Sequence, residues 1–379
     1  MEAVRKSDEK NIFLLLQDQS VDVDVADLLG RTPLHHAVEK SNFNVMKLLL
    51  EHGGNVDARA FGCFRSRQGQ VTALTLAAQG GNLDILKLLL SHSGADAIEL
   101  NNLKTALCCS AGKGNVDVVR LLLEHGATDH PRFKALVEPF MKKNDRPSKG
   151  KTAMSSALHI AAENGHTAVA ALLLGHGADP RAKDVQGRTS LCVAASKGRN
   201  EIVQLLLESA DQLDRKCAAT HKVPSHEEKG VVNDMGEYLS CGVMAATRIG
   251  HFDMVKMLLD HGADVNYNSL CDGSALYLAT TEQHKDIVKL LLENGADVNC
   301  RNTPDRVSAL HTAACIGNVE IADLLLQYGA DIDLTAGQDR EGKDSRPNDN
   351  WTALKFAAAK RQTKMAQFLL NRGASINST

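Results

Sequence analysis

The chain has 379 residues, of which 43% are hydrophobic, 23% are charged and only 4% are aromatic. This hydrophobic fraction argues against intrinsic disorder, and the scarcity of aromatic side chains favours thin stacked helices with small, interlocking side chains. With 43 basic and 46 acidic residues the net charge is −3, which gives no bulk argument for binding to nucleic acid or to an anionic membrane.

Cysteine usage and the first residues bear on the cellular compartment. The nine cysteines are scattered, odd in number and never spaced as Cys-x-x-Cys, which is typical of a reduced intracellular protein. The first residues lack the apolar core of a signal peptide, and no stretch approaches the roughly 20 apolar residues of a membrane span. We therefore expect a cytoplasmic or nuclear protein without membrane insertion.

An internal repeat dominates the sequence. Three of the eight steps between equivalent positions are 33 residues long, and the longer steps contain insertions. The equivalent positions are Leu34, Leu74, Leu107, Leu158, Leu191, Val243, Leu276, Leu310 and Leu354. A further unit lies upstream, so we expect ten units, at about residues 1–29, 30–58, 71–103, 104–128, 155–187, 188–211, 240–272, 273–306, 307–334 and 351–379.

Each unit predicts two helices in the same order. A Thr or Ser caps a short first helix, as Thr32 does before Pro33, and paired small residues let neighbouring helices approach closely. A Gly-Asn or Gly-His turn follows, and then a second helix with an apolar triplet such as Leu121-Leu122-Leu123. Gly-Ala-Asp ends the unit, because glycine readily takes the left-handed conformation of a helix C-cap.

The motif Thr32-Pro33-Leu34-His35, the 33-residue period and the ending Gly295-Ala296-Asp297-Val298-Asn299 together resemble the ankyrin repeat. Unit seven departs from the motif at Cys241-Gly242-Val243-Met244, and Ser41 and Gln283 replace the glycine between the helices. The resemblance implies an all-α solenoid that acts as a protein–protein interaction adaptor or scaffold. It also implies a monomer without cofactor, small-molecule substrate or catalysis. Repeat arrays need polar outer faces at both ends, and the charged residues of the first and last helix pairs fit that requirement.

Four insertions, at residues 59–70, 129–154, 212–239 and 335–350, fall between units, where the ankyrin family has finger loops beside its concave binding surface. The insertion at 129–154 combines a basic run, Lys142–Lys151, with an apolar stripe. It could be an arm that docks a partner, or its apolar side could pack on the solenoid. The candidate contact residues of this arm are Arg132, Phe133, Phe140, Lys142 and Lys143. An alternative function is therefore a nuclear, transcriptional or ubiquitin-ligase-associated regulator that uses the arm.

Catalysis and metal binding have little support in the sequence. The repeat accounts for most histidines, and in the family the imidazoles equivalent to His35, His159 and His311 hydrogen-bond the backbone. There is no nucleophile elbow, Walker loop or His-Glu-x-x-His motif. Cys217, His221 and His226 are the one group that could bind zinc, although their spacing matches no established finger and a flexible loop offers no second shell. A zinc-dependent activity is thus a distant alternative, and we expect no metal.

By resemblance, partners contact the finger tips and the exposed side of each first helix. The corresponding residues here are Arg31, Glu39, Lys40, Lys113, Glu163, Asn164, Arg188, Ser196, Lys197, Arg248, Glu282 and Lys360. Seven are basic and three are acidic, which favours a basic concave face that attracts an acidic segment of a partner protein. Ordinary scatter of surface charge is the alternative. Nucleic acid is not expected as a partner. The family also contains substrates of asparaginyl hydroxylation, and Asn266 and Asn299 match that sequence context.

Overall fold

The computed structural model describes residues 1–18, 20–61, 70–92, 100–126, 153–184, 186–219, 234–269, 273–302, 306–337 and 350–376. The chain divides into two compact units, Met1–Ser190 and Leu191–Thr379, which we describe separately as the N-terminal and C-terminal units. Both consist of consecutive helix pairs, so the expected all-α repeat architecture is confirmed.

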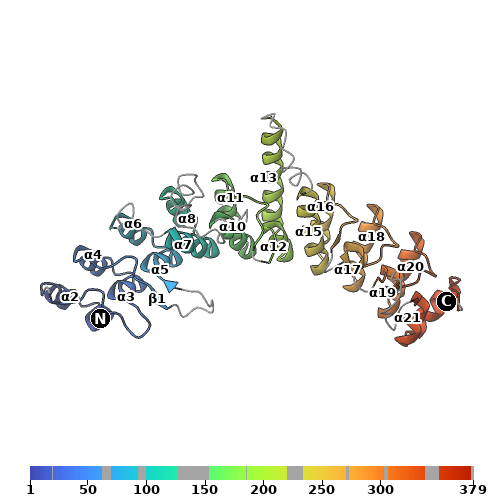
Figure 1. The fold of residues 1–379 in the computed structure, drawn as a ribbon, viewed down its shortest axis with the longest axis horizontal. Coiled ribbons are helices and arrows are strands. Elements are labelled where there is room, and N and C mark those ends of the chain that lie inside the picture. Colours follow the sequence, from blue (N-terminus) through green and yellow to red (C-terminus); the bar gives the residue numbers. More distant parts are fainter. Residues whose placement is uncertain are drawn as a thin grey trace, which may run out of the picture. The chain divides into compact units, whose positions relative to one another are not determined.

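In the N-terminal unit the first helix of each pair packs on the first helix of the next, and the second helices stack in the same way (Figure 1). The inner layer consists of α1 (Glu2–Lys6), α3 (Pro33–Glu39), α5 (Ala73–Gly80), α7 (Leu100–Lys113) and α10 (Ala153–Asn164). The outer layer consists of α2 (Glu9–Leu16), α4 (Phe43–Glu51), α6 (Leu83–His92), α8 (Val116–Glu124) and α11 (Thr167–Gly175). A two-residue antiparallel ladder joins β1 (Ala60–Phe61) to β2 (Gln70–Val71), with Ala60 opposite Val71.

The C-terminal unit repeats this arrangement. Its inner helices are α12 (Ser190–Ser196), which begins at the boundary, α15 (Asp234–Ile249), α17 (Ala275–Thr281), α19 (Ala309–Ile316) and α21 (Ala353–Ala359). Its outer helices are α13 (Asn200–Ala219), α16 (Phe252–Asp260), α18 (Lys285–Glu293), α20 (Val319–Gln327) and α22 (Thr363–Asn371). A second short antiparallel ladder joins β3 (Asn268–Ser269) to β4 (Gly273–Ser274).

The hydrophobic core of each unit lies between the two layers. Most marker residues of the inner helices are buried, as Leu34 and Leu310 are, and most second members of the outer triplets are buried too, as Leu122 and Leu325 are. Alanines at the ends of the inner helices, such as Ala162, are also fully buried, which lets adjacent pairs approach closely. A pair of this size cannot bury its own apolar face, so the stack stabilises each member.

Non-glycine residues at the turns keep the geometry that glycine adopts elsewhere. Ser41 has φ 53° and Gln283 has φ 61°, both in the left-handed region, as has Gly317 with φ 87° at the same point of its own pair. The departures from the repeat motif therefore leave the helix–turn–helix conformation unchanged.

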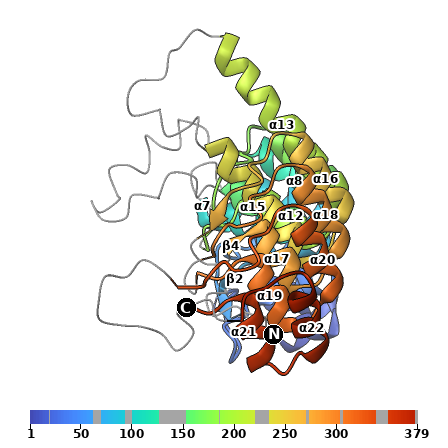
Figure 2. The same cartoon turned by 90° about the vertical axis from the view of Figure 1, so that its right-hand side faces the viewer.

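Much of the insertion expected at 212–239 is helical where the structure describes it. Helix α13 continues to Ala219, beyond the end of α16 in the same unit (Figures 1 and 2), and α15 already begins at Asp234. Most other outer helices end two residues before a left-handed glycine, as α16 does at Gly262 with φ 86°. Helix α13 carries Ala210 at that position, so no glycine cap ends it. The inner helices α7 and α10 likewise begin before their expected starts.

The expected polar outer face of the first helix pair is only partly present. Phe13, Leu14 and Leu15 of α2 are 47%, 61% and 51% exposed. Lys10 and Asn11 lie on the same helix, as predicted, but they do not cover these side chains. The prediction holds only in part because the apolar triplet that other outer helices largely bury is repeated in α2, where no described helix packs on its outward side.

Candidate protein-interaction surface

The predicted contact residues lie at the exposed ends of the inner helices and in the adjoining turns, which we call the inner-helix face. Ten of them are exposed, while Arg31 and Ser196 are half-buried. The exposed ones are Glu39, Lys40, Lys113, Glu163, Asn164, Arg188, Lys197, Arg248, Glu282 and Lys360. Because the two compact units are described separately, the face is described separately in each.

Arg31 and Glu39 neutralise each other. The Arg31 guanidinium donates to both carboxylate oxygens of Glu39, at 2.8 and 3.1 Å. The two residues are eight positions apart, one before α3 and one in its last turn, so their ion pair spans the exposed side of the helix. Arg31 is therefore not an available cation.

Asp27 organises the loop before α3. Its carboxylate accepts hydrogen bonds from the backbone amides of Leu29 and Arg31, both at 2.9 Å, and contacts the imidazole Nε2 of His36 at 3.1 Å. Arg5 forms an ion pair with the same carboxylate at 3.3 Å. Burial would raise the pKa of Asp27, but these hydrogen bonds outweigh it and lower the pKa to about 2. His36 thus has a structural partner in Asp27.

Asp184 plays the same part before α12. It accepts from the backbone amides of Gln186 and Arg188 and from the Arg188 side chain, with the guanidinium nitrogens at 2.9 and 3.0 Å. Arg188 is thereby neutralised within its own loop. Our sequence reasoning missed both aspartates, although the spacing Asp-x-x-Gly-Arg-Thr occurs in both loops and signals the turn.

The remaining cations lie at helix ends. Lys113 ends α7 and Lys360 follows α21, and neither forms an ion pair with a described residue. Lys197 follows α12, and Arg248 lies in the last turn of α15. The ammonium of Lys40 donates to the backbone carbonyl of Arg5. Cations are favourable at helix C-termini because the terminal carbonyls carry partial negative charge. All five side chains are exposed.

The histidines at the last position of the Thr-Pro-Leu-His motif, and at equivalent positions of other units, form hydrogen bonds with the backbone. The amide of Thr32 donates to Nδ1 of His35 at 3.2 Å, and Nε2 contacts the carbonyl of Val71 in the next pair at 3.1 Å. His311 makes the equivalent contacts with Ser308 and Trp351, both at 3.1 Å. The structural role implied by the ankyrin resemblance is confirmed.

Burial disfavours the thiolate form of two neighbouring inner-helix cysteines, Cys108 and Cys109. Burial raises the pKa of the Cys108 thiol to about 12, and Cys192 is also buried. Burial likewise raises the pKa of Cys109, against the opposing effect of Lys113. A nucleophilic cysteine needs its thiolate form, so these thiols fit packing rather than catalysis.

Asn266 and Asn299 link consecutive turns. The Asn266 side chain accepts from the amide of Asp297 at 2.7 Å and donates to the carbonyl of Gly295 at 3.2 Å. Asn299 accepts from the amide of Asp331 at 2.9 Å. Both side chains thus contribute to stacking, and their hydroxylation stays a prediction.

Several predicted residues lie outside the part that can be described. The arm residues Arg132, Phe133, Phe140, Lys142 and Lys143 fall in 127–152, and His221 and His226 fall in 220–233. Cys217 lies in α13, where only the backbone is described. Among described residues no three His, Cys, Asp or Glu side chains gather as a metal site, and no helix is long and apolar enough to span a membrane. Cytoplasmic or nuclear localisation stays a prediction.

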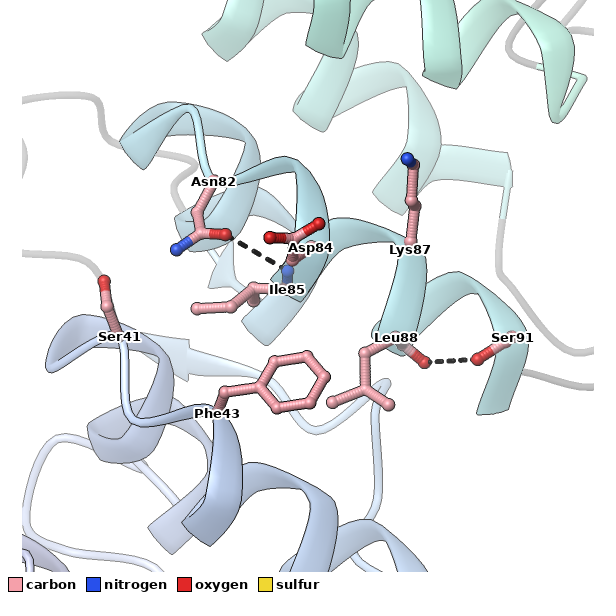
Figure 3. Close-up of a pocket in the computed structure, with 8 residues that line it drawn as sticks. All are labelled: Ser41, Phe43, Asn82, Asp84, Ile85, Lys87, Leu88 and Ser91. Carbon is pink, nitrogen blue, oxygen red and sulfur yellow. Dashed lines mark hydrogen bonds between the residues drawn. The ribbon is translucent and has the colours of Figure 1, made fainter.

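A hollow of about 600 Å³ lies between the outer helices α4 and α6. Figure 3 shows the ring of Phe43 turned toward Leu88 and Ile85, with Asp84 and Lys87 at the rim. Between α16 and α18 a smaller hollow of about 300 Å³ is lined by Phe252 and Leu290 among others. Both hollows thus lie between consecutive outer helices.

A family model for ankyrin repeats matches residues 1–98, 61–132, 93–184, 129–217, 225–302 and 299–379. Similar proteins include the B-cell lymphoma 3 protein homolog of Mus musculus, 47% identical over 13% of this chain and 11% of that protein. The ARF GTPase-activating protein GIT1 of Homo sapiens is 40% identical over 19% of this chain and 9% of that protein. The ankyrin repeat and KH domain-containing protein mask-1 of Caenorhabditis elegans is 33% identical over 36% of this chain and 5% of that protein.

The chain therefore spans about a tenth or less of the length of these relatives. The crystal structure of the human ASB11 ankyrin repeat domain is similar with 27% identity and a TM-score of 0.47, over 71% of this chain and 98% of that one. The family model covers nearly the whole sequence, in agreement with the helix pairs, the capping histidines and the left-handed turns. The chain belongs to the ankyrin-repeat family.

Proposed function

We propose that this protein is an interaction adaptor whose inner-helix face binds an acidic segment of a partner protein. Ankyrin repeats are protein–protein interaction modules, so membership of the family supports protein binding in general. That the partner segment is acidic is our own further step, and it is supported by the cations that the inner-helix face exposes.

The observation that carries the proposal is the exposure of cations at inner-helix ends in both units. Lys40 and Lys113 lie in the N-terminal unit, and Lys197, Arg248 and Lys360 lie in the C-terminal unit. Arg31 and Arg188 do not contribute, because Glu39 and Asp184 neutralise them. The cationic face is therefore smaller than the sequence suggested.

Exposed cations of this kind increase the rate of association with an acidic segment more than they increase its final affinity. Their effect falls as salt rises, because the screening length is about 8 Å at physiological ionic strength. The buried imidazoles and thiols are occupied by structural roles, which is consistent with recognition as the function.

The test is an affinity capture from cell lysate with quantitative mass spectrometry. Wild-type protein is compared with the triple variant Lys113→Glu, Lys197→Glu and Arg248→Glu. We expect loss of at least tenfold in captured partners that carry acidic segments, since each reversal replaces attraction with repulsion.

The matched control reverses three exposed cations of the outer helices, Lys87, Arg120 and Lys256, so both variants have the same net charge. The control should retain the partners. Equal retention by the two variants contradicts the proposal, and equal loss shows an effect of net charge rather than of the inner-helix face.

A further inference from the structure

Helix α2 presents an apolar face that no described helix covers. Leu14, at 61% exposure, lies at the centre of this face, and Phe13 and Leu15 flank it. The opposite side of the helix is buried through Ile12, and the described neighbours of α2 are α1 and α4. Three adjacent large apolar side chains at such exposure are typical of a protein interaction site.

The repeat shows what this face packs against elsewhere. Leu14 is the first member of its apolar triplet, as Leu88 is in α6 and Leu290 is in α18. Leu88 faces Phe43 of the preceding outer helix (Figure 3), and Leu290 lies with Phe252 in the equivalent hollow. Leu290 is only 8% exposed. The Leu14 face is thus the face that contacts another helix in later pairs.

Charges on this face are arranged symmetrically about Leu14. Lys10 lies four residues before it and Asp18 four residues after it, and residues four apart share one side of a helix. Helix α2 ends at Leu16, but the amide of Asp18 still bonds the carbonyl of Leu15 at 3.3 Å, which continues the turn. Along this face of α2 the side chains therefore follow the order cation, apolar residue, anion.

Both charges remain available for an intermolecular contact. Lys10 forms no ion pair with a described residue. Asp18 accepts from the backbone amide and hydroxyl of Ser20, at 2.9 and 2.8 Å, and these bonds lower its pKa and keep it ionised. The nearby Glu9 is already engaged by the side chain of Asn44 at 3.2 Å.

We propose that α2 of one molecule binds α2 of a second copy of this chain, antiparallel and around a two-fold axis at Leu14. Such an axis requires a self-complementary surface, and it places Lys10 of each copy against Asp18 of the other. The two leucines meet at the centre, and Phe13 and Leu15 extend the contact. This dimer replaces the monomer that the family resemblance implied.

The contact is small, so the dimer is weak. One helix face buries less than the roughly 1,600 Å² of a standard interface. Area alone does not set affinity, and we expect a dissociation constant on the order of micromolar. The inner-helix face lies in the other helix layer, so dimerisation through α2 leaves it free and presents two copies to one partner.

Sedimentation velocity of the full chain, over about a hundredfold range of concentration that brackets the micromolar region, tests the proposal. We expect wild type to shift from monomer to dimer, and Leu14→Lys to remain monomeric. Lys10→Asp sets like charges opposite each other twice, so we expect its dissociation constant to rise by on the order of tenfold.

The double variant Lys10→Asp with Asp18→Lys restores both charge pairs with reversed sign and should dimerise like wild type. The control is Lys364→Asp, which changes the equivalent position of α22 and should leave dimerisation unaffected. Circular dichroism checks that each variant is folded. A wild-type monomer throughout the range, or a dimer that persists in folded Leu14→Lys, overturns the proposal.

Discussion

At the scale of single residues, His311 shows how a buried polar group stabilises the stack. Its Nδ1 accepts from the amide of Ser308, so the proton is on Nε2, which donates to the carbonyl of Trp351. Only the neutral imidazole can make both bonds, because a protonated ring has no acceptor. Burial lowers the pKa of His311 to about 4, and the charge of Arg301 acts in the same direction, against Asp331 and the hydrogen bond with Trp351.

This arrangement predicts that stability falls as the pH is lowered from about 6.5 to about 4. In that window the unfolded chain binds a proton at His311 while the folded chain does not, so acid favours unfolding. The contribution reaches about 3 kcal/mol once the pH is below the folded pKa. His35, whose pKa burial also lowers, adds to it.

Urea unfolding at pH 7 and at pH 4.5 measures the effect. The His311→Gln variant should lose less stability between these two pH values than wild type does, because glutamine does not titrate. His261→Gln is the control, since that imidazole is exposed and bonds only the carbonyl of Met257 in its own turn. The same loss of stability in all three proteins would contradict this account.

At the scale of elements, the β3–β4 hairpin depends on a contact with the following pair. Gly273 in β4 has φ 76°, and a Cβ there would overlap the amide of Asn302. Asn302 is buried, and its backbone pairs with Val307 in the next loop, so the side chain has little room to move. Neighbouring fingers therefore fit together at this glycine.

We expect Gly273→Ala to destabilise the protein by roughly 1–3 kcal/mol more than Gly262→Ala does. Gly262 has a similar φ of 86° but open space around it, so its substitution measures the backbone strain alone. Thermal unfolding of both variants gives the difference. Asn302→Ala in the Gly273→Ala background should restore most of the additional stability lost at Gly273. Equal losses of stability at the two glycines would show that the contact with Asn302 does not contribute.

The elements were predictable where a local rule defines them. The repeated Thr or Ser cap, the apolar triplet and the closing glycine locate most helices, because each feature acts within one turn of the chain. The repeat period placed the end of α13 too early, because Ala210 stands where most other outer helices have a capping glycine. The ion pairs of Arg31 and Arg188 were missed because they depend on how the preceding loop folds around Asp27 and Asp184.

At the scale of the whole molecule, each described helix mainly contacts its partner in the pair and the helices of adjacent pairs. The stabilising contacts are therefore distributed along the chain rather than gathered in one central core. Such an arrangement suits recognition of an extended partner segment, and the exposed lysines of the inner-helix face recur along both compact units. The sequence predicts this face as the contact surface, but it could not show which cations the fold neutralises, as it does Arg31 and Arg188.

The most direct test of the central claim is zero-length coupling of carboxylates to lysines in the captured complexes, read by mass spectrometry. Lys40, Lys113, Lys197 and Lys360 represent the inner-helix face, and Lys47, Lys87, Lys256 and Lys364 represent the outer helices. The account predicts that aspartates and glutamates of the partner couple mainly to the first group. Coupling mainly to the outer-helix lysines, or equally to both groups, would contradict it.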